Sequence, residues 1–198
     1  MYRKSLDIKT RIYGGDNHPD VAKSFINIGL VYAGKGDFEN ALVQYQKGLE
    51  IKTRVLGSDH PDVANSYLGI GNVYYRQGQY ERALEYYQKC LDIRIRVFGS
   101  DHPDVARSHV NIGNVLDDMG KPEEALVHLQ KGLEIYLKVL GSDHPDVANS
   151  KENIGLVFQK MTKKSEARQM FTEAAGIRRK VFGADHPLTK KSERLAAQ

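Results

Sequence analysis

The sequence predicts an all-α protein built as a solenoid of repeated helical hairpins. The pair His-Pro recurs every 42 residues, starting at His18, His60, His102, His144 and His186. The octet GSDHPDVA stands unchanged at residues 57–64, 99–106 and 141–148. A fixed period of this length, with a helical pattern in every copy, indicates an array of stacked supersecondary units.

Each unit is expected to contain two helices, and the segment 60–101 shows them most clearly. The first helical face is apolar or small at Ala64, Tyr67, Ile70, Gly71 and Tyr74. These positions follow the i, i+3, i+4, i+7 spacing of one side of an α-helix. A second apolar stripe runs over residues 80–98, long enough for about five turns, or about 30 Å.

The octet is best explained as a helix boundary. Gly57 follows the last apolar position of one helix, where a residue that accepts a left-handed conformation is favoured. Pro61 suits the first position of the next helix, and Asp62 places a negative charge at the positive end of its dipole. We therefore assign His60 and its equivalents to the N-cap. Gly78 and its equivalents are expected to end the first helix of each unit.

Catalytic and metal-binding roles for the repeated histidines conflict with this geometry. Equivalent residues of stacked repeats lie at least about 8–10 Å apart, whereas all ligands of one zinc ion lie about 2 Å from it. The segment GLVYAGKG at 29–36 nearly matches the sequence motif of a phosphate-binding loop. However, Gly29 aligns with glycines that are expected inside helices, where a glycine allows close helix packing and does not form a loop. Cys90 aligns with small residues and is expected to be buried. We predict no enzymatic activity, no cofactor and no metal.

The composition argues against a membrane-spanning or nucleic-acid-binding protein. Of the 198 residues 40% are hydrophobic, and no apolar run is long enough to span a membrane. The net charge of +4 comes mainly from residues 151–198, where eleven Lys and Arg face five Asp and Glu. The rest of the chain is nearly neutral, so a nucleic-acid partner is not expected. A single cysteine and no signal-peptide pattern favour a cytoplasmic location.

The repeat resembles the tetratricopeptide repeat in the 42-residue form of kinesin light chains. In the second repeat the matching residues are Tyr67, Ile70, Gly71, Tyr74, Gly78, Ala83, Tyr87 and Cys90. The third repeat has His109 in place of an aromatic residue, and the fourth has Thr162 in place of the turn glycine. The resemblance implies a right-handed superhelical solenoid that binds partner proteins.

The resemblance covers essentially the whole chain as a single array, residues 1–198. We expect a half-repeat at 1–17, full repeats at 18–59, 60–101, 102–143 and 144–185, and a half-repeat at 186–198. The half-repeats either cap the array or result from its excision from a longer one, and we favour excision. Exposed half-repeats also allow self-association.

The polar face of the first helices is the candidate binding site, because the resemblance implies that first helices line a peptide-binding concave surface. The candidate residues are Lys23, Asn27, Asn65, Asn72, Tyr75, Arg76, Arg107, Asn111, Asn114, Asn149 and Asn153. Asparagine forms helices about 0.6 kcal/mol less readily than alanine, so seven on one face need another reason. Amides can bind an extended peptide backbone, and the basic residues suggest an acidic one.

Two alternatives remain open at this stage. The amides could instead bond to neighbouring helices, which would make them part of the scaffold. The whole array could also be a structural spacer or a self-association element within a larger signalling or NTPase protein.

Overall fold

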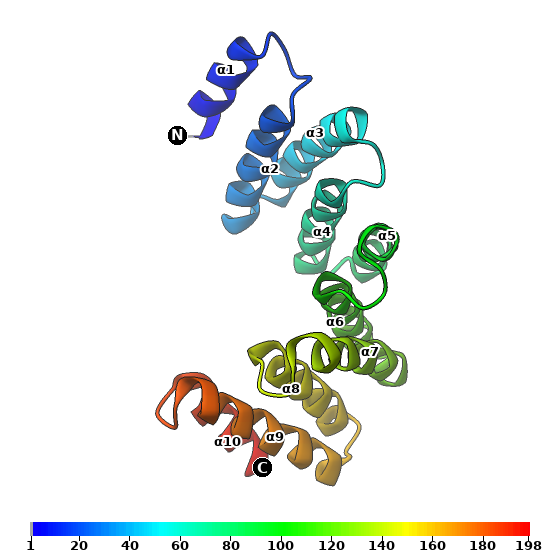
Figure 1. The fold of residues 1–198 in the computed structure, drawn as a ribbon, viewed down its shortest axis with the longest axis vertical. Helices are drawn as coiled ribbons and strands as arrows, with labels where there is room; N and C mark the ends of the chain where they lie inside the picture. The colour runs from blue at the N-terminus through cyan, green and yellow to red at the C-terminus, as the bar shows by residue number, and fades with distance from the viewer. Residues whose placement is uncertain (1) are drawn as a thin grey trace. The chain divides into compact units, whose positions relative to one another are not determined.

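The computed structural model describes residues 2–198, which form ten α-helices and no β-strand (Figure 1). The helices are α1 (Tyr2–Ile12), α2 (Pro19–Gly34), α3 (Phe38–Leu56), α4 (Pro61–Arg76), α5 (Tyr80–Phe98), α6 (Pro103–Asp118), α7 (Pro122–Leu140), α8 (Pro145–Lys160), α9 (Lys164–Phe182) and α10 (Pro187–Ala196). The predicted all-α solenoid of helical hairpins is confirmed. Residue 1 of the predicted half-repeat 1–17 lies outside the described residues. None of the helices in 2–198 has both the length and the hydrophobicity needed to cross a membrane.

The chain divides into two compact units, one ending at Val97 and the other beginning at Phe98. In the first unit, α2 packs on α3 and α3 on α4, around buried residues that include Tyr45, Ile70 and Cys90. In the second unit, α6 packs on α7, α7 on α8, α8 on α9 and α9 on α10. Its buried residues include two clusters. One contains Ala106, Tyr136, Val147, Ala148, Ala174 and Ile177, and the other contains Leu129, Ile154 and Val157. The expectation that Cys90 is buried is confirmed, since it is 1% exposed.

Each His-Pro pair starts a helix, and the histidine caps it. The Nδ1 atom accepts a hydrogen bond from the backbone N–H two residues later, at 3.1 Å for His18, His60, His102 and His144 and at 3.2 Å for His186. The predicted N-cap role is therefore confirmed. Where an aromatic residue stands four positions earlier it stacks on the capping ring, as Phe98 does on His102 with centroids 4.3 Å apart.

The first aspartate of the octet has a role that the sequence did not reveal. It pairs with a basic residue near the end of the second helix of the following repeat. The pairs are Asp59 with Arg96 at 2.6 Å, Asp101 with Lys138 at 2.6 Å and Asp143 with Lys180 at 3.0 Å. All six side chains are exposed, so each pair contributes little to stability.

Two residues with positive φ differ from what the sequence pattern predicts for helix ends and turns. Gly57 has φ 86° and ψ 158°, so it is not in the left-handed helical conformation expected there. It lies instead in an extended region that is open almost only to glycine, and it still ends α3. Thr162 has φ 61°, which places a side chain where Gly120 and its equivalents form the same turn in other repeats.

Glycines inside the first helices allow the second helices to approach closely. A Cβ atom on Gly71 would lie 2.6 Å from the ring of Tyr87, and one on Gly29 would lie 3.2 Å from the carbonyl oxygen of Ala41. Gly29 is buried within α2 and does not belong to a loop. The expectation of close packing is confirmed, and 29–36 has no phosphate-binding loop geometry.

Candidate functional site

In the unit that ends at Val97, the predicted binding residues lie on α2 and α4, which contact each other. The exposed members are Lys23, Asn65, Asn72 and Arg76. The half-buried members are Asn27 and Tyr75. The sequence pattern therefore identified a real solvent-facing surface of the first helices, which we call the α2–α4 face.

In the unit that begins at Phe98, the remaining members lie on α6 and α8, which also contact each other. Arg107 and Asn149 are exposed, while Asn111, Asn114 and Asn153 are half-buried. The Nδ2 atom of Asn153 donates a hydrogen bond of 3.2 Å to Oδ1 of Asn114, which joins the two helices. We call this surface the α6–α8 face.

Several of the asparagines use their amide oxygen inside the protein. Oδ1 of Asn65 accepts a hydrogen bond of 3.0 Å from Arg94, and Oδ1 of Asn149 accepts one of 2.8 Å from Arg178. Because a guanidinium group can only donate, these two amide orientations are unambiguous. Their NH₂ groups therefore remain on the solvent side, and both faces present hydrogen-bond donors.

Tyr87 and Asn72 make a third contact of this kind, from α5 to α4. The Tyr87 hydroxyl donates a hydrogen bond of 2.7 Å to Oδ1 of Asn72. Burial of the ring raises the pKa of Tyr87 above its ordinary value, which keeps the hydroxyl protonated and able to donate. The alternative in which amides bond to neighbouring helices is thus correct for the oxygens of these asparagines.

Charged side chains add to the donor character, although some of them are partly engaged. Arg76 donates a hydrogen bond of 2.6 Å to the carbonyl of Ala33 and lies over the ring of Phe38. Arg107 pairs with Asp104, one turn earlier on the same helix. The negative charge at the end of α6 is partly compensated, because Lys160 of α8 bonds Asp117 at 2.7 Å and lies 3.8 Å from Asp118. Negative charge on the α6–α8 face is therefore reduced.

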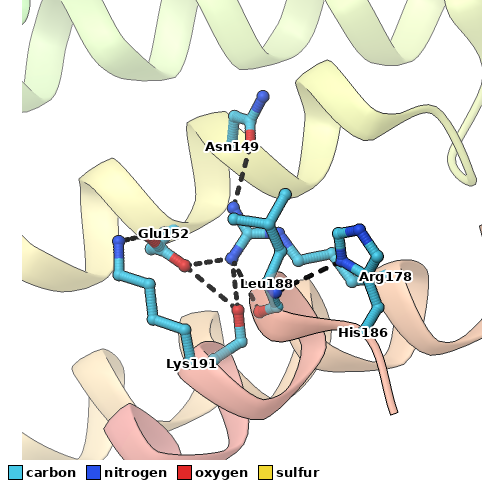
Figure 2. A network of polar contacts seen from close by, with 7 residues as sticks. Asn149, Glu152, Arg178, His186, Leu188 and Lys191 are labelled. Atoms are coloured by element: carbon cyan, nitrogen blue, oxygen red, sulfur yellow. Dashed lines mark hydrogen bonds and ion pairs between the residues drawn. The ribbon is translucent and has the colours of Figure 1, made fainter. Parts of the chain in front are cut away.

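A buried polar network lies beneath the α6–α8 face (Figure 2). Arg178 is 3% exposed and donates to Asn149, to Glu152 and to Ser192 of α10. Glu152 also accepts a hydrogen bond of 2.7 Å from Lys191. Burial alone would raise the pKa of Glu152, but the hydrogen bonds from Lys191, Arg178 and Ser192 together lower it below its ordinary value. The network joins α8, α9 and α10 and fixes the position of Asn149.

Two histidines of the third repeat make a contact that was not predicted from the sequence. Nδ1 of His109 in α6 lies 3.1 Å from Nδ1 of His128 in α7, and both rings are half-buried. Burial, with a smaller contribution from His128, lowers the pKa of His109 to about 4, and burial followed by Lys131 lowers the pKa of His128. Alignment of the repeats could have indicated this contact. His109 and His128 stand 42 positions after Tyr67 and Tyr86, whose rings also contact each other.

The fold and the two donor-rich faces define a helical-repeat scaffold of the kind that carries protein interactions. The family model for the tetratricopeptide repeat matches residues 1–54, 20–95, 62–138 and 118–180. The chain belongs to the tetratricopeptide repeat family. No curated protein sequence matches it.

Solved structures show the same fold at low sequence identity. The nearly identical TPR-like repeats of a Podosopora anserina protein described as a putative kinesin light chain superpose with a TM-score of 0.77 at 23% sequence identity, covering 91% of this chain and 85% of that one. BtubC (BKLC) from P. vanneervenii has a TM-score of 0.82 at 19% sequence identity, and the match covers 99% of this chain and 82% of that one. Aspartyl phosphate phosphatase F from Bacillus subtilis has a TM-score of 0.78 at 15% sequence identity. The match covers 90% of this chain but only 45% of that one.

Proposed function

We propose that this tetratricopeptide repeat scaffold is a non-enzymatic adaptor that binds a short, extended, acidic segment of a partner protein on its first-helix faces. The observation that carries the proposal is the occupied amide oxygen of Asn65 and Asn149. Because each amide oxygen already accepts a hydrogen bond inside the protein, the amide offers mainly its N–H groups to a ligand. Such a surface favours ligands rich in acceptors, namely backbone carbonyls and carboxylates.

Basic side chains on the same faces support an acidic ligand. Lys23 is exposed on the α2–α4 face, and Arg107 is exposed on the α6–α8 face. Tyr75 is half-buried and offers ring surface to an apolar or aromatic anchor within the acidic segment. We expect the anchor to supply most of the affinity and the charges to guide encounter and select the partner.

The remaining elements of the proposal follow from the sequence. We propose that the chain acts as a single array in the cytoplasm and uses neither a cofactor nor a nucleic-acid partner. A chain with one cysteine needs no oxidising compartment to fold. The near-neutral charge of residues 1–150 offers no phosphate-binding stripe.

Two charge reversals of the same kind test the proposal. Arg107→Glu reverses a charge on the α6–α8 face, while Arg168→Glu reverses an exposed charge on α9 in the same unit. A peptide array should show that the parent chain retains sequences enriched in Asp and Glu. Arg107→Glu should abolish this preference and Arg168→Glu should leave it intact. Equal behaviour of the two variants on every peptide would contradict the proposal.

Self-association is the second candidate, and one hollow favours it. A cavity of about 740 Å³ lies between α9 and the end of α10, lined by Lys164, Arg168, Thr172, Ala196 and Gln198 among others. A helix of a second copy could occupy it. In this case sedimentation would show association that rises with concentration, and Arg168→Glu, not Arg107→Glu, would disrupt it. A parent chain that stays monomeric at high concentration rejects this candidate.

A further inference from the structure

The seven histidines of the chain fall into two groups with different roles. Five of them cap helices, each with Nδ1 accepting a backbone N–H, namely His18, His60, His102, His144 and His186. The other two, His109 and His128, cap nothing. They come from neighbouring helices, α6 and α7, and their Nδ1 atoms form a hydrogen bond of 3.1 Å, in which one ring donates and the other accepts.

This separation matches that of two nitrogens bound to one metal ion. Imidazole nitrogens lie about 2.0–2.1 Å from a bound zinc ion, so two of them stand about 2.8–3.4 Å apart for angles between a right angle and the tetrahedral value. The Nδ1 atoms of His109 and His128 already lie within that interval. To bind a metal, each ring would have to turn its Nδ1 lone pair away from the other nitrogen and toward a common point.

We propose that His109 and His128 form a two-ligand site for a divalent transition-metal ion that prefers imidazole nitrogen, such as Zn²⁺. Water would complete the coordination, because both rings are only half-buried and solvent reaches the site. No group of three or more potential ligands occurs among the described residues. The ion would join α6 to α7 and hold the third repeat together.

The protonation state of the pair suits this role. Metal binding requires neutral imidazole with an unprotonated nitrogen. The lowered pKa of both rings keeps them neutral at pH 7. Binding would need both rings in the tautomer with the proton on Nε2, and the metal would replace the hydrogen bond between the two Nδ1 atoms. Two charged groups of α7 face the pair, Lys131 opposing a cation and Glu124 favouring one.

The second repeat supplies a matched variant that is compatible with the fold. Tyr67 and Tyr86 occupy the equivalent positions there, with ring centroids 6.0 Å apart at 45°, while the two histidine rings lie 5.2 Å apart at 46°. The double substitution His109→Tyr with His128→Tyr therefore removes both ligands and installs the pair that the second repeat accommodates at the same positions. His144→Asn is the control, because asparagine retains an N-cap acceptor and leaves the pair intact.

The experiment is calorimetric titration of the tag-free chain with Zn²⁺ at pH 7, with Mg²⁺ in a parallel titration. We expect one saturable Zn²⁺ per chain, no Mg²⁺ binding, and a melting temperature that rises with Zn²⁺ concentration. Loss of an outer-shell partner alone weakens metal sites about 10–100-fold, so the double tyrosine variant should bind more than about 100-fold more weakly. His144→Asn should bind as the parent does.

A second measurement on the parent chain makes the test independent of any variant. Zn²⁺ should move the side-chain ¹⁵N resonances of His109 and His128 and leave those of the five capping histidines in place. The proposal is overturned if the parent shows no saturable Zn²⁺ binding, if the double tyrosine variant binds as tightly as the parent, or if the resonances that move belong to capping histidines.

Discussion

Arg178 of α9 donates a hydrogen bond of 2.8 Å to Oδ1 of Asn149 in α8, so a buried charge fixes a residue of the α6–α8 face from beneath. Arg94 and Asn65 repeat this relationship at 3.0 Å in the other unit. The same asparagine therefore serves the fold with its oxygen and faces solvent with its NH₂ group. We expect a substitution at this position to change both stability and the proposed binding, and the two effects must be separated.

Asn149→Ala should lower the free energy of unfolding by about 1–3 kcal/mol, because it removes an acceptor from a buried guanidinium group. Asn111→Ala is the matched control, since Asn111 lies on the same face and has no side-chain hydrogen bond among the described residues. It should change stability by less than about 0.5 kcal/mol. Urea unfolding of both variants measures the difference, and equal losses would show that the Arg178 contact contributes little.

The charge of Glu152 should make the stability of its unit depend on pH. Its pKa in the folded state is lowered, so it contributes stability above the ordinary carboxyl pKa, and this contribution is lost as the pH falls through the lowered value. Unfolding should therefore become easier as the pH falls below about 4.5. Glu152→Gln should remove the contribution of this carboxylate to the pH dependence of the unfolding free energy. If the unfolding free energies of parent and variant run parallel from neutral to acidic pH, the network is not ionised as described.

Thr162 adopts φ 61° at a turn where Gly120 adopts φ 74°. A left-handed conformation is unfavourable by about 1–2 kcal/mol for a residue with a Cβ atom, and a β-branched side chain adds to the strain. Thr162→Gly should therefore raise the free energy of unfolding by about 1 kcal/mol. The reverse exchange, Gly120→Thr, should lower it by a similar amount or more. Thermal unfolding of both variants tests the pair, and a destabilising Thr162→Gly would contradict it.

Histidine is an unusual N-cap, and its contribution can be measured at His144. His144→Ala should destabilise the chain by about 1 kcal/mol, because the N–H of Asp146 loses its acceptor. His144→Asn should restore the loss, since the asparagine oxygen can accept the same hydrogen bond. The comparison uses denaturant unfolding at pH 7. An asparagine variant no more stable than the alanine variant would mean that the ring acts by packing instead of by capping.

Much of the fold was predictable because every repeat contains the same signals for helix starts, helix ends and buried helix faces. Pro61, Gly78 and the apolar spacing of 60–101 each have a local cause, so helix starts and ends follow from neighbouring residues alone. The ψ of Gly57 was not predictable, since whether glycine turns into the helical or the extended positive-φ region depends on where the following loop packs. The ion pair of Asp59 with Arg96 was missed for the same reason, as it joins residues 37 apart.

The candidate faces were predictable only as surfaces. Helical periodicity placed Asn65 and Asn149 opposite the core stripe, and the structure finds them exposed. It could not show that their oxygens are taken by Arg94 and Arg178, because helix-to-helix register is set by tertiary packing. The contact between His109 and His128 was hidden for a similar reason, since only the packed hairpin brings 109 and 128 together.

The most direct test of the account observes the asparagine NH₂ groups themselves. Titration of the ¹⁵N-labelled chain with a short acidic peptide that carries one tyrosine should shift the side-chain NH₂ signals of Asn111, Asn149 and Asn153. Backbone signals of α7 and α9, the second helices of the same unit, should move little. Shifts confined to α7 and α9, or no shift with any acidic peptide, would contradict the claim that the first helices form a donor-rich binding face.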